Sequence, residues 1–144
     1  SVALPLAKEL LDTDSENVSA NYLVGQILLN QQNPSGIKYI ERAIDKDIHI
    51  VVDGCQLIYS FLMQQGDTNS AKLYRQRAEK HYDKMLKAQQ EREYIQTTDK
   101  FQPHGLLQAE LNSLCQQLSR YTEITKVYLV QKKVEHFPEK PLYI

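Results

Sequence analysis

Hydrophobic residues recur every three or four positions through much of the chain, which is the spacing of one face of an α-helix. One such row runs through Val18, Tyr22, Gly25 and Leu29. It predicts a helix over residues 18–31 with one buried face. We therefore expect a mainly α fold in which consecutive helices pack side by side. The same spacing predicts further helices over residues 4–11, 35–46, 51–65 and 69–95.

Two stretches, residues 20–47 and 55–80, repeat one arrangement of small and large residues. Gly36 and Ala71 occupy equivalent positions 35 residues apart, and a second pair of small residues repeats the interval. A period of this length, with small residues at fixed points on two helices, is typical of stacked helical hairpins. The pattern therefore predicts a scaffold of paired helices. The positions that we assign to the repeat are Gly25, Gly36, Ala43, Gly66, Ala71 and Ala78.

The hydrophobic pattern changes after residue 96. Pro103 and Gly105 interrupt the helical spacing, and a helix is then predicted over residues 106–121. Residues 126–134 are β-branched and aromatic, which predicts a strand, and a second strand opens at Leu142. We expect two domains, residues 1–96 and 97–144. The second is an α+β unit of a helix and a β-hairpin, and we expect it to be incomplete because two strands alone are marginally stable.

Charge and composition exclude several classes of function. The formal net charge of the 144 residues is −1, and the basic residues of the 69–95 helix are interrupted by acidic ones, so we expect no nucleic-acid binding. No apolar run is long enough to span a bilayer. Cys55 and Cys115 form no CxxC motif, and we expect both to be buried free thiols.

The compartment is less well determined by the sequence. Two unpaired cysteines are compatible with a reducing compartment, and we favour the cytoplasm. The chain starts without Met and stops in an apolar stretch at Leu142–Ile144. We therefore expect a fragment of a longer protein, which missing segments can tether to a membrane.

No residues form a recognisable catalytic or ligand-binding motif. The four histidines lack the His-Glu-x-x-His spacing of a zinc site, and no Gly-rich phosphate loop or G-x-S-x-G turn is present. We expect this chain to be non-enzymatic, with no catalytic residue, no cofactor and no metal. His104, in the loop beside Gly105, is expected to bond the backbone through its ring. The other three are His49, His81 and His136.

The residues Gly66, Ala71 and Ala78, with Leu62 on the preceding helix, resemble the tetratricopeptide repeat, and divergent relatives of the Sel1 type fit as well. In the first copy Gln31-Gln32-Asn33 replaces the turn glycine. The resemblance covers about residues 4–82. It implies a short right-handed array of helical hairpins, and a concave groove that receives a peptide or a helix of a protein partner. The residues that we expect to line this groove are Asn21, Gln26, Gln56 and Ser60.

Two further hypotheses come from the C-terminal part. The turn Pro103–Leu106 and the strand Tyr128–Lys132, with the preceding helices, resemble the soluble tail of bacterial membrane proteins, some of them HtpX-like zinc metallopeptidases. That resemblance implies an accessory or regulatory segment of a membrane-bound peptidase, although the peptidase motif is missing. The strand edge at 126–134 also suggests a homo-oligomer formed by strand pairing.

Overall fold

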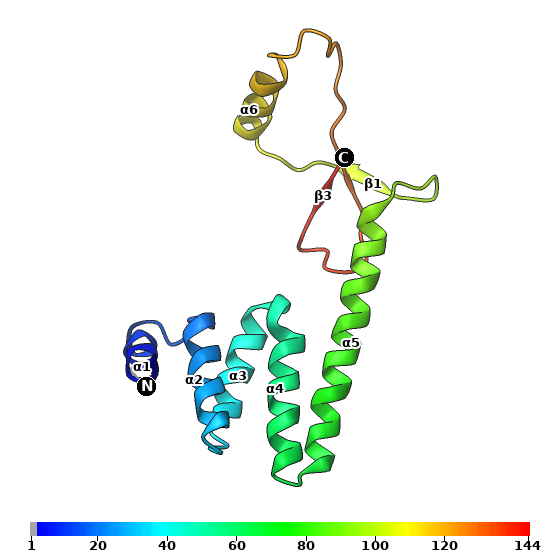
Figure 1. The fold of residues 1–144 in the computed structure, drawn as a ribbon. Coiled ribbons are helices and arrows are strands. Elements are labelled where there is room, and N and C mark those ends of the chain that lie inside the picture. Colours follow the sequence, from blue (N-terminus) through cyan, green and yellow to red (C-terminus); the bar gives the residue numbers. More distant parts are fainter. Residues whose placement is uncertain (1–2) are drawn as a thin grey trace. The chain divides into compact units, whose positions relative to one another are not determined.

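The computed structural model describes residues 3–144, which are mostly helical (63%) with a small antiparallel sheet near the C-terminus (Figure 1). The expected mainly α class with a C-terminal α+β unit is therefore confirmed. The chain forms two compact units. The N-terminal unit ends at Asp83, and the C-terminal unit is Lys84–Ile144. The elements are α1 (Ala3–Thr13), α2 (Val18–Asn30), α3 (Gly36–Lys46), the 3-10 turn η1 (Ile48–Ile50), α4 (Val51–Gln64), α5 (Thr68–Glu93), β1 (Phe101–Pro103), α6 (Gln108–Leu118), β2 (Val130–Lys132) and β3 (Leu142–Tyr143).

The division between the two units lies inside α5, earlier than the domain boundary that the sequence suggested after residue 96. The sequence places its boundary where the helical pattern stops. The structure divides where the packing partners of α5 change, because residues beyond Asp83 belong with the C-terminal segment. Each unit is described separately below.

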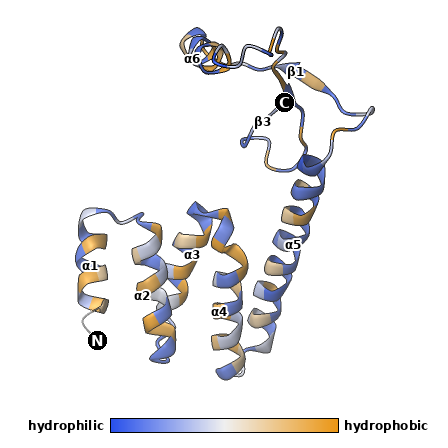
Figure 2. Cartoon of the chain, turned by 45° about the horizontal axis from the view of Figure 1, so that its top comes forward, coloured by the Kyte–Doolittle hydropathy of each residue, from blue (hydrophilic) through white to orange (hydrophobic). Residues whose placement is uncertain are grey.

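The N-terminal unit consists of helices that pack through apolar faces (Figure 2). Ile40 and Ile58 are fully buried in its core. Asn17 caps α2, since its side-chain oxygen accepts the N–H of Ala20 at 3.0 Å. The larger of two core clusters contains Leu29, Ile40, Ile44, Val51, Cys55, Ile58, Phe61, Leu62 and Ala71, and the smaller contains Ala7, Val24 and Leu28.

Small residues allow α2 and α3 to approach closely. A Cβ added to Gly36 would lie 2.6 Å from the carbonyl oxygen of Gly25, and one added to Gly25 would lie 2.9 Å from that of Gly36. Both distances are too short for real contacts, so each position requires glycine. Ala43 and Ala71 are buried in the same way, and Ala78 packs half-buried against the core. The structure thus places five of the six assigned repeat positions at helix-packing positions.

The sixth repeat position, Gly66, lies in the turn after α4 and adopts a φ of +78°. The equivalent turn after α2 contains Gln32, with a φ of +59°. In both turns a backbone N–H reaches back to the last turn of the helix: Asn33 donates to Leu28 at 2.9 Å, and Asp67 donates to Leu62 at 3.0 Å. This is the hydrogen-bond pattern of the Schellman cap, and the two hairpins therefore share it although only one has glycine.

Polar side chains connect α3 to α5. The hydroxyl of Tyr74 donates to Glu41 at 2.6 Å, and Arg77 pairs with Asp45 at 2.8 Å. Burial, followed by the Glu41 carboxylate, raises the pKa of Tyr74 well above its ordinary value. These contacts supplement the apolar packing of the second hairpin on the first.

The C-terminal unit contains a three-stranded antiparallel sheet with the order β1-β2-β3. β1 lies in the segment that the sequence suggested was a loop, and it completes the sheet from within the chain. β2 is the central strand, bonded to both neighbours: Lys133 donates to Lys100 at 2.8 Å, and Val130 donates to Ile144 at 3.0 Å. Residues 130–132 are therefore paired on both sides and do not form the free edge that was expected within 126–134.

The expectations for the two cysteines and for His104 have different outcomes. Cys55 is buried, and burial raises the pKa of its thiol, but Cys115 is exposed on α6. The expectation of a buried thiol was wrong for Cys115 because no residue of α6 is buried. His104 accepts the backbone N–H of Leu106 through Nδ1 at 3.0 Å, as expected for a loop histidine that bonds the backbone.

Candidate functional site

The N-terminal unit has a hollow of about 270 Å³ on the first helices of the two hairpins. Leu29 and Phe61 are buried at this site, and Leu57 is half-buried. None of the lining residues is ionisable. We call this site the α2–α4 hollow, and its lining residues are Leu29, Asn30, Gln32, Leu57, Ser60, Phe61 and Gln64.

The four residues expected to line a groove have different positions. Ser60 lines the α2–α4 hollow, and its hydroxyl donates to the carbonyl of Gln56 at 2.9 Å. Gln26 and Gln56 are exposed but do not line it. Asn21 is fully buried, so its assignment to a groove is a mistaken one.

The buried amide group of Asn21 hydrogen-bonds to the backbone of the turn before α2. Its Nδ2 donates to the carbonyl oxygens of Ser15 and Asn17, each at 2.9 Å. These carbonyls belong to the turn before α2. The side chain therefore holds that turn against the helix and is not available to a ligand.

Gln32 and Gln64, which the sequence did not suggest, line the hollow, and Gln65 is hydrogen-bonded to Gln32 beside it. The Nε2 of Gln32 donates to the Oε1 of Gln64 at 3.1 Å, and the Nε2 of Gln65 donates to the Oε1 of Gln32 at 2.6 Å. The side chain of Gln32 thus bridges the two hairpin turns. The signal was present in the sequence, because the Gln-rich turn at 31–33 and the pair Gln64–Gln65 occupy equivalent places in the repeat.

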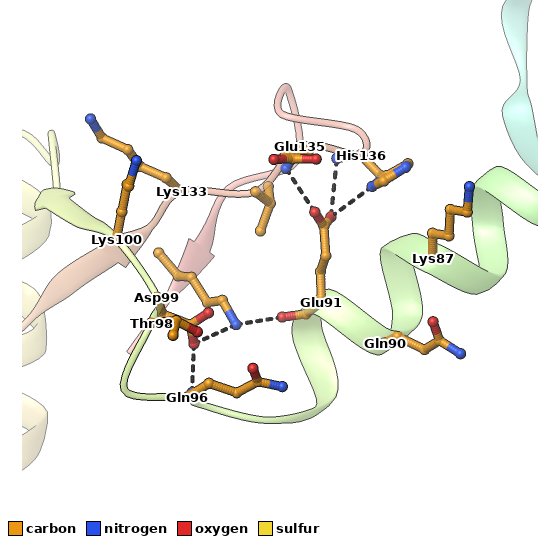
Figure 3. Close-up of a pocket in the computed structure, with 12 residues that line it drawn as sticks. Lys87, Gln90, Glu91, Gln96, Thr98, Asp99, Lys100, Lys133, Glu135 and His136 are labelled. Carbon is orange, nitrogen blue, oxygen red and sulfur yellow. Dashed lines mark hydrogen bonds and ion pairs between the residues drawn. The ribbon is translucent and has the colours of Figure 1, made fainter.

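The C-terminal unit has a larger and more polar hollow, of about 520 Å³ (Figure 3). We call it the Glu91 pocket, after the side chain that reaches across it toward the chain between β2 and β3. Charged groups of both signs surround it. Its lining residues are Lys87, Gln90, Glu91, Gln96, Thr98, Asp99, Lys100, Lys132, Lys133, Val134, Glu135 and His136.

The carboxylate of Glu91, on α5, accepts hydrogen bonds from the segment between β2 and β3. Its Oε1 accepts the backbone N–H of Glu135 and its Oε2 accepts that of His136, both at 3.0 Å (Figure 3). The Nδ1 of His136 lies 3.2 Å from the same Oε2. Burial alone would raise the pKa of Glu91, but the two N–H groups and the His136 ring outweigh it and hold the pKa below its ordinary value.

Lys132 lies on the central strand β2, and its side chain caps the C-terminal end of α5. Its ammonium group is buried and donates to the carbonyl oxygens of Glu91 at 2.7 Å and Tyr94 at 2.9 Å. It also pairs with Asp99 at 2.7 Å. The backbone N–H of Gln96 and this ammonium lower the pKa of Asp99. A cation at this place satisfies carbonyls that have no partner within the helix and interacts favourably with the helix dipole.

A metal ion can be considered at Glu91, Glu135 and His136. One ligand atom from each lies within 4.8 Å of the others, and carboxylate oxygen with imidazole nitrogen is a donor set that zinc accepts. Both oxygens of Glu91 already accept backbone N–H groups, which suits a structural fastening. The sequence did not suggest this cluster, because Glu91 is far along the chain from the adjacent pair and no local motif connects them.

Comparison with known proteins adds no assignment. No protein-family model matches the chain, and no curated protein or solved structure matches it at a significant level. Within residues 3–144, no helix combines the length and the apolar composition that crossing a membrane requires.

Proposed function

We propose that this chain is a non-enzymatic protein–protein interaction scaffold, and that the α2–α4 hollow receives a peptide segment or a helix of the partner. The observation that carries the proposal is the position of the hollow, on the first helices of two consecutive hairpins that share their turn geometry. Arrays of stacked hairpins use such extended surfaces for binding.

The size of the hollow supports a peptide as the ligand. Pockets for small molecules generally measure about 300–1,000 Å³ and enclose most of the ligand. A hollow of about 270 Å³ is smaller, and it suits one anchoring side chain of a longer segment. Leu29, Leu57 and Phe61 would contact that side chain.

The chemistry of the rim supports recognition of a peptide backbone. Asn30, Gln32 and Gln64 carry amide groups, which both donate and accept hydrogen bonds. Because none of the lining residues is ionisable, the ligand segment is expected to be apolar and uncharged where it enters the hollow. Its affinity should therefore depend weakly on salt concentration.

Selection from a random peptide display library against the immobilised 144-residue chain tests this function. We expect enriched peptides that share an apolar anchor, with saturable binding in a fluorescence-anisotropy titration. Ser60→Leu places a larger apolar side chain in the hollow and should weaken binding at least tenfold, which corresponds to about 1.4 kcal/mol.

Gln56→Leu is the matched control, because Gln56 lies one turn away on the same helix and outside the hollow. It should leave the affinity within twofold. An absence of enriched peptides, or equal binding by the Ser60→Leu chain, would contradict the proposed site.

A further inference from the structure

Helix α6 has an apolar side that its own chain does not cover. Leu111, Leu114 and Leu118 follow one another at the three-and-four spacing of a packing face, yet none of the residues of α6 is buried. Leu107 just before the helix and Tyr121 just after it continue the row, and they are 72% and 60% exposed. A helix with such a face normally buries it against another element.

The rest of the C-terminal unit has the same character. Its buried hydrophobic residues are Ala88 and Phe137, and neither belongs to α6. Ile124, Val127 and Tyr128, which follow α6, are all exposed. Exposed apolar residues are thus frequent both in α6 and in the segment that follows it.

Charge distribution identifies the partner that this side fits. Between Leu106 and Ser119 the charged residue is Glu110, and Arg120 follows directly. In an antiparallel pair of identical helices centred on Leu114, Glu110 of each copy would lie near Arg120 of the other. A parallel pair would instead keep Glu110 of one copy about 15 Å along the helix axis from Arg120 of the other, so the two charges would not pair.

We propose that two copies of this chain associate through their α6 helices, packed antiparallel about a two-fold axis near Leu114. The apolar row is then self-complementary, since Leu114 meets its own copy at the centre and Leu111 lies beside Leu118 of the second copy. Such an interface is isologous, as in most homodimers. One helix pair is a small interface, so the dimer forms in a concentration-dependent equilibrium.

Sedimentation velocity of the full chain over a wide concentration range tests the proposal. The wild-type chain is expected to shift from monomer to dimer as concentration rises. Leu114→Glu places two carboxylates at the centre of the pair and should abolish the dimer over the same range. Arg120→Glu replaces two attractive pairs with repulsive ones and should raise the dissociation constant about tenfold.

Leu73→Ala is the control for loss of an exposed leucine, since Leu73 lies on α5 and is 65% exposed. It should leave the association unchanged. Circular dichroism of each variant shows that the remaining helices are intact. A second readout is Cys115, which is exposed and next to Leu114. Mild oxidation should give a disulfide-linked dimer through Cys115 in the wild type and not in Leu114→Glu.

Three results would overturn the proposal. A chain that stays monomeric at all concentrations has no such interface. A dimer that survives Leu114→Glu uses another surface, and a dimer that is insensitive to Arg120→Glu is not antiparallel about this centre.

Discussion

The two units of the molecule are stabilised by different interactions. In the N-terminal unit, apolar residues from successive helices form two core clusters, with Ile40, Ile58 and Val24 fully buried. In the C-terminal unit, the buried hydrophobic residues are Ala88 and Phe137. There the chain is fastened to the end of α5 by polar side chains that bond backbone groups.

Three side chains of the C-terminal unit carry most of this fastening. Glu91 accepts two backbone N–H groups, and Lys132 donates to two helix carbonyls. Arg92 donates to the carbonyls of Phe137 and Lys140 at 3.0 and 3.1 Å. Burial of apolar area is insensitive to pH, whereas these contacts depend on charge. The comparison therefore predicts that the two units respond to different perturbations.

The largest effect is expected from a cavity in the N-terminal core. Ile58→Ala removes buried methyl groups from a fully buried position and should lower the free energy of unfolding by about 2–5 kcal/mol. Urea denaturation followed by circular dichroism measures it. Leu73→Ala, at an exposed position, should stay within about 0.5 kcal/mol. Equal effects of the two substitutions would argue against the core described here.

Loss of the buried ammonium group is expected to affect the C-terminal unit alone. Lys132→Met keeps an unbranched apolar stem but leaves the carbonyls of Glu91 and Tyr94 and the Asp99 carboxylate without their donor. We expect a local cost of about 1–3 kcal/mol. Hydrogen exchange should speed up at the end of α5 and in β2, while the amides of α2–α4 stay protected.

Lys133→Met serves as the control, because the neighbouring Lys133 is exposed. Its exchange pattern should match the wild type. Faster exchange across the N-terminal core in Lys132→Met would contradict the separation of the two units.

Acid is expected to weaken the C-terminal unit through Glu91 and Asp99. Both carboxyl groups have folded-state pKa values below the ordinary 4.5 and 3.8, so their stabilisation is present at neutral pH. It is lost as the pH falls below the ordinary values and through the folded-state values. Amide hydrogen exchange or fluorescence, followed as the pH is lowered from 6 to 2, should show that this unit opens at a higher pH than the N-terminal unit.

The N-terminal unit supplies a comparison in the same titration. Asp67 also has a lowered pKa, from hydrogen bonds to Ser70, but it is exposed and its contribution is small. Glu91→Gln should reduce the acid sensitivity of the C-terminal unit and leave that of the N-terminal unit unchanged. Acid opening of both units at one pH would count against this difference.

The smallest effects are expected at the two hairpin turns, with opposite signs. Gly66→Ala places a Cβ at a φ of +78°, where the structure leaves space but the backbone is strained, and should cost about 1 kcal/mol. Gln32→Gly relieves the same strain and should gain a few tenths to about 1 kcal/mol, less what the glutamine bridge contributes. Thermal denaturation measures both changes in stability. If both substitutions destabilise the chain, the hydrogen bonds of the Gln32 side chain contribute more than its backbone strain costs.

Helices with a regular apolar face could be predicted closely from the sequence. α2 was expected over residues 18–31 and is Val18–Asn30, and α4 was expected over 51–65 and is Val51–Gln64. Periodicity and local caps determine such elements, and both are visible along the chain. α6 was expected over 106–121 and is shorter, Gln108–Leu118, with Leu107 and Ser119 as its cap residues.

The sheet and the polar sites could not be predicted in the same way. β1 is three residues long, contains Pro103 and exists because it pairs with β2. β2 is shorter than the expected 126–134 because its partners are short. Asn21 was mistaken for a surface residue because its burial depends on the carbonyls of the preceding turn. Non-local pairing of this kind leaves little trace in sequence spacing.

The burial of Lys132 has a consequence for chemical labelling. Its buried ammonium group is held by two main-chain oxygens and a carboxylate, so a reagent does not reach it while these contacts last. Acylating reagents would therefore modify Lys132 only when the last turn of α5 opens and releases it. Its labelling rate, compared with that of its neighbour Lys133, would report how often this helix end comes apart.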